Sequence, residues 1–304
     1  MLVPRLAALA PAAAVLPVAL VGCAGSTGTT STDTAATGTA AATASAPVRS
    51  ILLTDDDGWD AEGIRTLYAV LGAAGYDVTV VAPLHNQSGA SMSVSGGALS
   101  AGVDASDPAL HWVDGTPADA ARLGLTGILD SPPDLVVSGV NNGANVGYNV
   151  NYSGTVGAAS VAAELGVPAI AVSADVGEAG ADFAGASELV LELIRGLSAA
   201  AAAEMAAGTV VNLNVPVPAA DGTAPDVVTA PQSTASWTTL DYVAGADGLW
   251  TPEQSPIAAD TGDQALLAAG FATVTPLTLV RDDDSKDSDD EALEADLDAF
   301  AERY

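Results

Sequence analysis

From about residue 50 onward, the hydrophobic pattern alternates between strand-like and helix-like stretches. Short and largely apolar runs predict buried strands at residues 50–54, 78–82, 135–138, 168–173 and 210–215. The spacing of Ile64, Leu67, Tyr68 and Leu71 is that of one helical face, and further helices are expected at residues 118–128, 155–165 and 183–206. Strands that alternate with helices favour an α/β fold, in which helices cover both faces of a mostly parallel sheet.

The two ends of the chain have a different composition. Residues 1–22 read as an export signal, with one early charge at Arg5 followed by an apolar run and small residues. The stretch that ends at Cys23, LVGC, resembles a bacterial lipobox, and Cys23 is the only cysteine. Residues 23–47 are expected to be a lipidated cysteine and a flexible tether rich in Ala, Thr, Ser and Gly. These features predict an exported, extracytoplasmic lipoprotein that meets the membrane only through this anchor.

The remaining residues divide into a globular part and a tail. Residues 48–281 have the size of one α/β domain, and residues 282–304 form an acidic tail. Within the tail, Ala292, Leu293, Leu297 and Phe300 have near-helical spacing, which predicts a short terminal helix.

Charge excludes some classes of partner. The chain of 304 residues has a formal net charge of -30, and 49% of its residues are hydrophobic. So many apolar residues argue against a disordered acidic chain. With 8 Lys and Arg against 38 Asp and Glu, the chain is also a poor ligand for nucleic acid polymers. A small phosphate could still bind through a metal ion and backbone N–H groups.

Oxygen-bearing side chains follow the predicted strands. Asp55, Asp56 and Asp57 follow the first strand, Ser88 lies beyond the second, and Asn141 lies beyond residues 135–138. In a parallel sheet, ligands bind at the carboxyl ends of the strands. Three adjacent carboxylates repel one another unless a divalent cation joins them, and oxygen ligands select Mg²⁺, Mn²⁺ or Ca²⁺.

The stretch YSGTVGAA at residues 152–159 is a turn of small residues that leads into a predicted helix. A helix start of this kind offers N–H groups and hydroxyls to an anion without any basic side chain. A plain helix cap by Ser153 or Thr155 is the alternative. Opposite an oxygen-rich metal site, the pattern favours phosphate binding.

Several motifs in this order resemble the SurE family. They are ILLTDDDG at 51–58, GI at 63–64, VAP at 81–83, NQSG at 86–89, GTPAD at 115–119, PDLVVSGVN at 133–141 with Gly143, Asn145 and Gly147, YSGTVGAA at 152–159, NLNVP at 212–216 and VTPL at 274–277. The resemblance covers nearly all of residues 48–279. It implies a Rossmann-like α/β/α fold with an extra β-hairpin region, and homodimers or homotetramers that exchange C-terminal elements.

The same resemblance implies a divalent-metal-dependent phosphatase that hydrolyses nucleoside monophosphates. The metal ligands would be Asp56, Asp57, Ser88 and Asn141. The phosphate would be bound by Asn145, Ser153, Gly154 and Thr155. Asp56 and Asp57 are then the candidate catalytic residues, and we expect Asp57 to orient the attacking water as well.

Two features depart from the family pattern. Asp55 stands where the family usually has Asn, so the site gains a potential negative charge. In residues 231–237 the chain also lacks the basic residues that many relatives carry there, which leaves Trp237 and Tyr242 as candidates for stacking on a base.

Two other interpretations remain open from the residues. Asp55 and Asp57 followed by Gly58 mimic the nucleophile and acid of a haloacid-dehalogenase-type phosphatase, although the only lysine, Lys286, lies in the tail. A non-catalytic lipoprotein that binds a metal or solute is the second. A Ser-His-Asp hydrolase is disfavoured because no Gly-x-Ser-x-Gly motif accompanies His85 or His111.

Overall fold

The computed structural model describes residues 48–236, 238–258, 261–279 and 291–303. The chain divides into two units, residues 1–42 and residues 43–304, and the fold described below is that of the second unit. The expected signal, Cys23, the whole tether, Trp237 and the acidic turn of the tail lie outside the described residues. No helix in the described part is long and apolar enough to cross a membrane.

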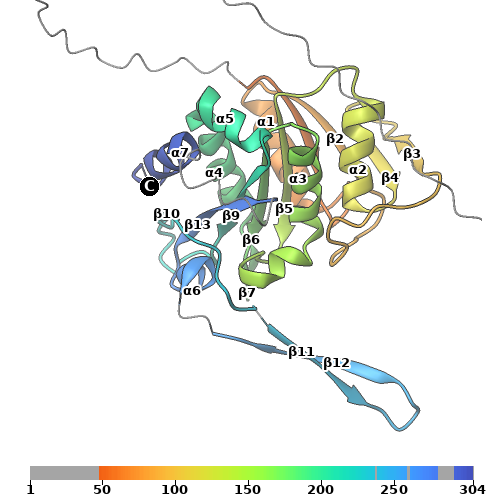
Figure 1. Cartoon of the computed structure of the whole chain (residues 1–304), viewed down its shortest axis with the longest axis vertical. Helices are drawn as coiled ribbons and strands as arrows, with labels where there is room; N and C mark the ends of the chain where they lie inside the picture. The colour runs from red at the N-terminus through yellow and green to blue at the C-terminus, as the bar shows by residue number, and fades with distance from the viewer. Residues whose placement is uncertain (1–47, 237, 259–260, 280–290, 304) are drawn as a thin grey trace, which may run out of the picture. The chain divides into compact units, whose positions relative to one another are not determined.

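A nine-stranded sheet forms the centre of this unit, with strand order β10-β13-β9-β6-β5-β1-β2-β4-β3 (Figure 1). Its strands are β1 (Ser50–Thr54), β2 (Asp77–Pro83), β3 (Ser100–Val103), β4 (Leu110–Asp114), β5 (Leu135–Asn142), β6 (Ala169–Ala174), β9 (Thr209–Val215), β10 (Val227–Thr229) and β13 (Ala272–Thr278). Neighbouring strands are parallel, except for the antiparallel pairs β3·β4 and β9·β13. All five strands predicted from the sequence belong to it.

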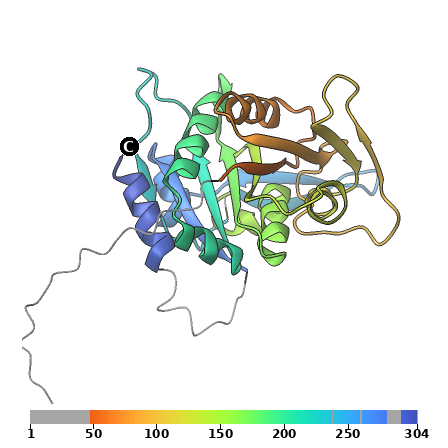
Figure 2. The same cartoon turned by 90° about the horizontal axis from the view of Figure 1, so that it is seen from above.

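The helices complete a three-layer arrangement. They are α1 (Glu62–Ala73), α2 (Pro117–Leu123), α3 (Gly154–Glu164), α4 (Phe183–Gly196), α5 (Ala199–Ala206), α6 (Gly262–Ala268) and α7 (Glu291–Ala301), with a π-helical turn η1 (Gly124–Ile128) and a 3-10 turn η2 (Gly147–Asn151). Figure 2 shows α1 on one side of the sheet and α2 and α3 on the other. The fold is therefore the expected Rossmann-like α/β/α class.

Alternation along the strands explains why both faces of the sheet are covered. In β1, Ile51 and Leu53 join the core on the side of α1 and α4, while Leu52 joins the core that contains Val156 and Ala159 of α3. Successive side chains of a strand point to opposite faces, so a continuously apolar strand requires helices on both.

The predicted helix at residues 183–206 is wrong as a single element. The structure divides it into α4 and α5, with Leu197 extended between them. Ser198 starts the second helix, because its hydroxyl accepts a hydrogen bond from the N–H of Ala201 at 3.1 Å. A serine N-cap of this kind competes with continuation of the preceding helix. The predicted helix at residues 118–128 is α2 extended by the π-helical turn η1.

The terminal helix expected in the tail is present as α7. Leu293, Leu297 and Phe300 are buried in the core on the side of α1 and α4. The carboxylate of Glu204 in α5 accepts hydrogen bonds from the N–H groups of Ala292 and Leu293, at 3.2 and 2.7 Å. The helical end of the tail is therefore part of the domain.

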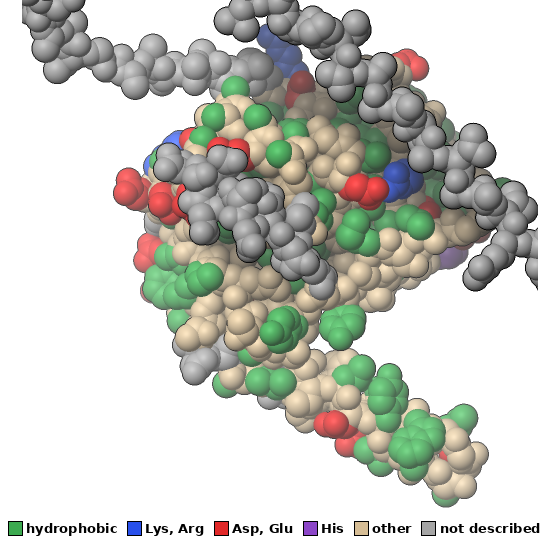
Figure 3. All heavy atoms as spheres, viewed as in Figure 1, with side chains coloured by type: hydrophobic (Ala, Val, Ile, Leu, Met, Phe, Trp, Pro, Cys, Tyr) green, Lys and Arg blue, Asp and Glu red, His purple; other side chains and the backbone are tan. Residues whose placement is uncertain are grey.

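A separate two-stranded antiparallel hairpin consists of β11 (Thr238–Ala244) and β12 (Trp250–Pro256), and it extends away from the main sheet (Figure 1). Figure 3 shows hydrophobic side chains along it. Leu240, Tyr242, Val243, Leu249 and Trp250 are all exposed. A second small pair is formed by β7 (Val176–Gly177) and β8 (Gly180–Ala181). The extra hairpin region implied by the resemblance is thus present.

Candidate active site

A cavity of about 810 Å³ lies between the carboxyl ends of the central strands and the root of the β11–β12 hairpin. A volume of this size is typical of sites for small organic ligands. Residues from the strand ends and from the start of α3 line one side: Asp56, Ser88, Gly89, Asn141, Asn142, Gly143, Ala144, Asn145, Asn149, Tyr152 and Ser153. Residues at the root of the hairpin line the other: Ser236, Thr238, Thr239, Leu240, Gln254 and Ile257.

Asp56 is the carboxylate that lines this cavity, although its side chain is only 3% exposed. Its Oδ1 accepts a hydrogen bond of 2.5 Å from the hydroxyl of Thr155. Gly154 allows this approach, because a Cβ there would lie 2.7 Å from the Cβ of Asp56. The start of α3 therefore lies against Asp56, where the helix dipole favours a negative charge.

Asp57 is half-buried, does not itself line the cavity and is held on both of its oxygens. Oδ1 accepts from Nδ2 of Asn86 and Oδ2 from the backbone N–H of Asn142, each at 2.8 Å. Burial raises the pKa of Asp57, the charge of Asp56 raises it further, and the hydrogen bonds from Asn142 and Asn86 oppose the rise. These two bonds fix the carboxylate between the loop after β2 and the end of β5.

Asp55 faces the interior and does not line the cavity. Its Oδ1 accepts the backbone N–H of Asp56 at 2.8 Å, while Oδ2 is buried without a partner among the described residues. Burial holds the pKa of Asp55 well above its ordinary value, and the charges of Asp56 and Asp57 add to the effect. The expectation of three carboxylates around one cation is therefore corrected. Within the described part of the chain, no three His, Cys, Asp or Glu side chains are grouped to hold a metal ion.

The remaining predicted ligands fit a cation bound by mixed oxygens. Ser88 is exposed and Asn141 is buried, and both line the cavity with Asp56. Asn141 donates its Nδ2 to the carbonyl of Gly143 at 2.7 Å, which orients its amide. Its Oδ1 accepts no hydrogen bond among the described residues, so this oxygen is available to coordinate a cation. Carboxylate, amide and hydroxyl oxygens suit hard divalent cations such as Mg²⁺.

The predicted phosphate-binding residues fall into two groups. Asn145 and Ser153 line the cavity. Asn145 is anchored from both sides, because its side chain donates to Ser173 at 2.9 Å and its backbone N–H donates to Asn214 at 2.7 Å. Ser153 caps α3 through the N–H of Val156 at 3.0 Å. Gly154 and Thr155 lie in the first helical turn, and the hydroxyl of Thr155 is directed to Asp56 rather than into the cavity.

Sequence reasoning from the residues missed the hairpin wall of the cavity. Its lining residues are polar or isolated apolar side chains, and they carry no local motif. Only the resemblance to the SurE family implied a hairpin region, and it did not place that region at the cavity. Tyr242, proposed for base stacking, lies further out on the hairpin and does not line the cavity, and neither His85 nor His111 lines it.

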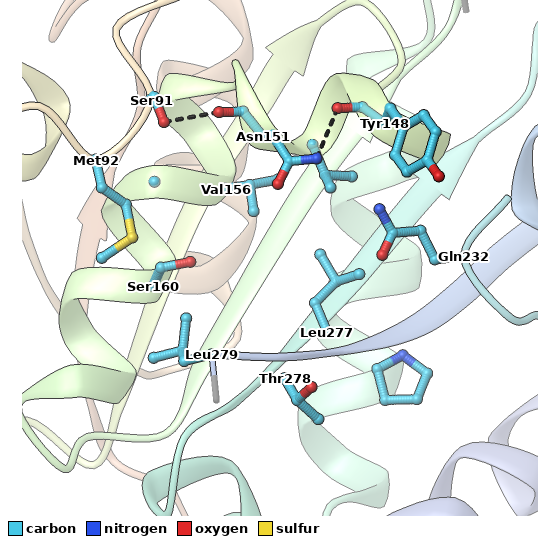
Figure 4. A pocket seen from close by; sticks show the side chains of 13 residues that line it. Ser91, Met92, Tyr148, Asn151, Val156, Ser160, Gln232, Leu277, Thr278 and Leu279 are labelled. Carbon is cyan, nitrogen blue, oxygen red and sulfur yellow. Dashed lines mark hydrogen bonds between the residues drawn. The ribbon is translucent and has the colours of Figure 1, made fainter. Parts of the chain in front are cut away.

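A second cavity of about 450 Å³ lies on the other side of η2 (Figure 4). Figure 4 shows Ser91 directed toward Asn151 and the amide of Asn151 toward Tyr148. The hydroxyl of Ser91 donates to the Asn151 carbonyl at 2.7 Å, and Nδ2 of Asn151 donates to the Tyr148 carbonyl at 3.0 Å. The loop that carries Ser88 is thereby fastened to η2.

Comparisons with known proteins agree with this geometry. The family described as "Survival protein SurE" matches residues 51–239. A protein of Solidesulfovibrio magneticus named 5'-nucleotidase SurE is 41% identical in an alignment 239 residues long, which covers 75% of this chain and 90% of that protein. A protein of the same name from Nitratidesulfovibrio vulgaris is 39% identical over 75% of this chain and 86% of its own length.

A solved structure supports the same assignment at the level of the fold. The crystal structure of the SurE protein from Aquifex aeolicus superposes with a TM-score of 0.63 at 28% identity, and the match covers 77% of this chain and 95% of that one. SurE proteins are divalent-metal dependent in general. With the family match spanning residues 51–239 and these relatives aligned over most of their length, the chain belongs to the SurE family.

Proposed function

We propose that the protein is a divalent-metal-dependent phosphomonoesterase that hydrolyses nucleoside monophosphates to nucleoside and phosphate, a 5'-nucleotidase of the SurE type. The observation that carries this proposal is the shared cavity. It brings the oxygens of Asp56, Ser88 and Asn141 together with the phosphate-binding candidates Asn145 and Ser153. The activity named for the relatives supports the same reaction.

Asp56, Asp57, Ser88 and Asn141 would hold the cation. When bound, a divalent cation of this kind polarises phosphoryl oxygens and makes a bound water more acidic. Mg²⁺ and Mn²⁺ fit these oxygen donors, and Ca²⁺ is the third candidate. The N–H groups at the start of α3, beside Ser153, would bind the phosphate, and Asn145 would contact it from the same cavity. We propose that Asp57, fixed by Asn86 and Asn142, orients the attacking water.

The haloacid-dehalogenase alternative is not favoured. It requires Asp55 as the nucleophile, but this side chain is fully buried and does not line the cavity. Such chemistry also uses a Lys or Arg to neutralise the phosphoaspartate, but the only lysine is Lys286 in the tail, and no arginine lines the cavity. Beryllofluoride, which mimics a phosphoaspartate, should therefore not trap the protein. A non-catalytic binding role is likewise not favoured, because the relatives are named as enzymes.

The direct experiment measures phosphate release from AMP, GMP and para-nitrophenyl phosphate with added Mg²⁺, Mn²⁺ or Ca²⁺. We expect release that depends on the cation, and that is lost on chelation and in Asp56→Ala. Ser88→Ala and Asn141→Ala should raise the cation concentration needed for half-maximal rate. No release from any substrate with any cation would instead favour the binding role.

We also propose that the protein is a homodimer or homotetramer. The apolar and exposed side chains on the hairpin support this, because such side chains are seldom left in water on an isolated domain. Light scattering on the full chain, compared with a Leu249→Ser and Trp250→Ser double variant, tests it. A wild-type monomer would refute the proposal.

Localisation as an exported lipoprotein anchored through Cys23 is proposed from the sequence of residues 1–47. Incorporation of labelled palmitate into the wild type but not into Cys23→Ala, together with membrane association of the wild type alone, is the expected result. A wild type that takes up no label would contradict the anchor.

A further inference from the structure

The root of the hairpin is tied to η2 by a cluster of buried hydrogen bonds around the start of α6. We call the residues on the two sides of this root the hairpin base: Ser233, Ala235, Ser236 and Ile257. The phosphate side of the cavity is built by η2 and the residues that flank it. The contact between η2 and the hairpin base therefore fixes the position of the hairpin wall relative to the phosphate side of the cavity.

Asp263 is at the centre of this cluster and is fully buried. Its Oδ1 accepts the N–H groups of Ser233 and Gln264, each at 2.8 Å. The N–H of Gly147 lies 3.2 Å from Oδ1 and 3.3 Å from Oδ2. One carboxylate thus binds backbone amides of the hairpin base, of α6 and of η2. Gly147 and Asp263 are 116 positions apart in the chain.

Other bonds join the same three segments. Gln264 donates Nε2 to the Ile257 carbonyl at 2.6 Å. Gln232, which Figure 4 shows near Tyr148, donates Nε2 to the carbonyl of Gly147 at 2.8 Å. The N–H of Tyr148 donates to Ala235 at 2.9 Å. Gly147 also has φ +56°, and a Cβ there would lie 2.2 Å from the Ala235 carbonyl oxygen, so only glycine allows this approach.

The phosphate-binding candidates do not depend on this cluster. Asn145 is held by Ser173 and Asn214, and its carbonyl accepts further bonds from Asn212 and Asn214 at 2.8 and 3.0 Å. Ser153 is held within the first turn of α3. Loosening Asp263 should therefore shift the hairpin wall and leave the phosphate side of the cavity in place.

We propose that Asp263 is a positioning residue that holds the hairpin base on η2, so that the hairpin wall contacts the nucleoside of the substrate and favours nucleotides over small phosphoesters. This inference rests on the proposed function. Asp263 lies outside the cavity lining and acts only through the backbone of the segments it binds. The nucleoside is the part of a nucleotide that extends beyond the phosphate-binding residues, and the hairpin wall faces them across the cavity.

The test compares Asp263→Asn with the wild type, using the full chain and saturating Mn²⁺. Asparagine keeps one accepting oxygen but loses the charge, and it turns an NH2 group toward the N–H of Gly147, which Oδ2 faces in the wild type. The tie between η2 and the hairpin base is therefore weakened with little change in size. Gln264→Met is the second and milder variant, because it removes the bonds from Nε2 to the carbonyls of Ile257 and Ser236, at 2.6 and 3.4 Å. Asp134→Asn is the matched control, because Asp134 accepts the N–H groups of Arg49 and Ser50, at 2.9 Å each, and does not line the cavity.

Two pairs of measurements separate positioning from a merely structural role. The first is KM and kcat for AMP and for phenyl phosphate; the second is calorimetric binding of adenosine and of inorganic phosphate. In Asp263→Asn we expect KM for AMP and the Kd for adenosine to rise about tenfold, the scale of one lost charged hydrogen bond. KM for phenyl phosphate and the Kd for phosphate should stay within about twofold, and Gln264→Met should shift in the same direction.

Equal losses for AMP and phenyl phosphate in Asp263→Asn, or losses of the same pattern in Asp134→Asn, would overturn the proposal. So would a wild type that does not bind adenosine. Failure of the proposed function has a different signature, since the wild type would then release no phosphate from AMP. In that case the calorimetric binding of adenosine to the wild type and to Asp263→Asn still tests whether Asp263 positions the hairpin wall.

Discussion

Replacing Thr155 by valine tests whether the start of α3 supports the metal site through Asp56. Thr155 is fully buried, and its hydroxyl donates to Oδ1 of Asp56 at 2.5 Å. Nδ2 of Asn145 lies 3.5 Å from the same hydroxyl oxygen. Valine has nearly the same shape and removes the donor, so Asp56 loses a hydrogen bond to its charged form while the packing of α3 is kept.

The magnitude follows from the kind of bond that is lost. A hydrogen bond to a charged group contributes about 1.5–3 kcal/mol, and each 1.4 kcal/mol is a factor of about ten in affinity. Loss of a partner that orients a metal ligand typically costs about 10–100-fold in affinity. Both estimates predict that Thr155→Val binds Mn²⁺ between about 10- and 100-fold more weakly than the wild type.

Calorimetric titration of the metal-free protein with Mn²⁺ measures this affinity directly, without relying on turnover. Thr155→Ser keeps the hydroxyl and should retain most of the affinity. Thr273→Val is the matched control, because its hydroxyl is also fully buried but has no partner among the described residues. Wild-type affinity in Thr155→Val, or an equal loss in Thr273→Val, would refute the reasoning.

Three further predictions concern charge. Asp55→Asn removes one of three adjacent carboxylates from a buried position, so without metal the variant should have a higher Tm than the wild type. Added Mn²⁺ should raise the Tm of the variant by less than it raises that of the wild type. An unchanged Tm without metal would contradict this prediction. Burial acts to raise the pKa of Asp119, but hydrogen bonds from Ser95 and Thr116 outweigh it and hold the pKa below 3.8. The charged Asp119 should therefore stabilise the fold fully above pH 3.8, and this stabilisation should be lost as the pH falls through the lower pKa of the folded state. Urea unfolding should show that the difference in unfolding free energy between the wild type and Asp119→Asn decreases only below pH 3.8. The net charge of -30 repels a phosphate substrate, so moderate salt should raise kcat/KM for AMP, and a steep fall with salt would contradict this view.

Much of the fold could be predicted because its signals are local. Apolar runs such as Ile51 to Leu53, buried on alternate faces, already require helices on both sides of a sheet. The amphipathic spacing of Leu293, Leu297 and Phe300 likewise predicts the helix α7, which packs these side chains into the core. What these patterns do not contain is strand order. The insertion of β13 between β10 and β9, antiparallel to β9, depends on contacts between distant segments.

The sequence by itself determined which residue types follow the strands and therefore that an oxygen-rich site lies at their carboxyl ends. Only the tertiary structure decided that Asp56 lines the cavity while Asp55 is turned into the interior. The same holds for the hairpin wall and for Asp263, which binds the N–H of Gly147 from 116 positions away. Periodicity reports which face of its own element a side chain occupies. The groups it meets there depend on how the elements pack, and this packing sets the burial, the hydrogen bonds and the charge on which the site depends.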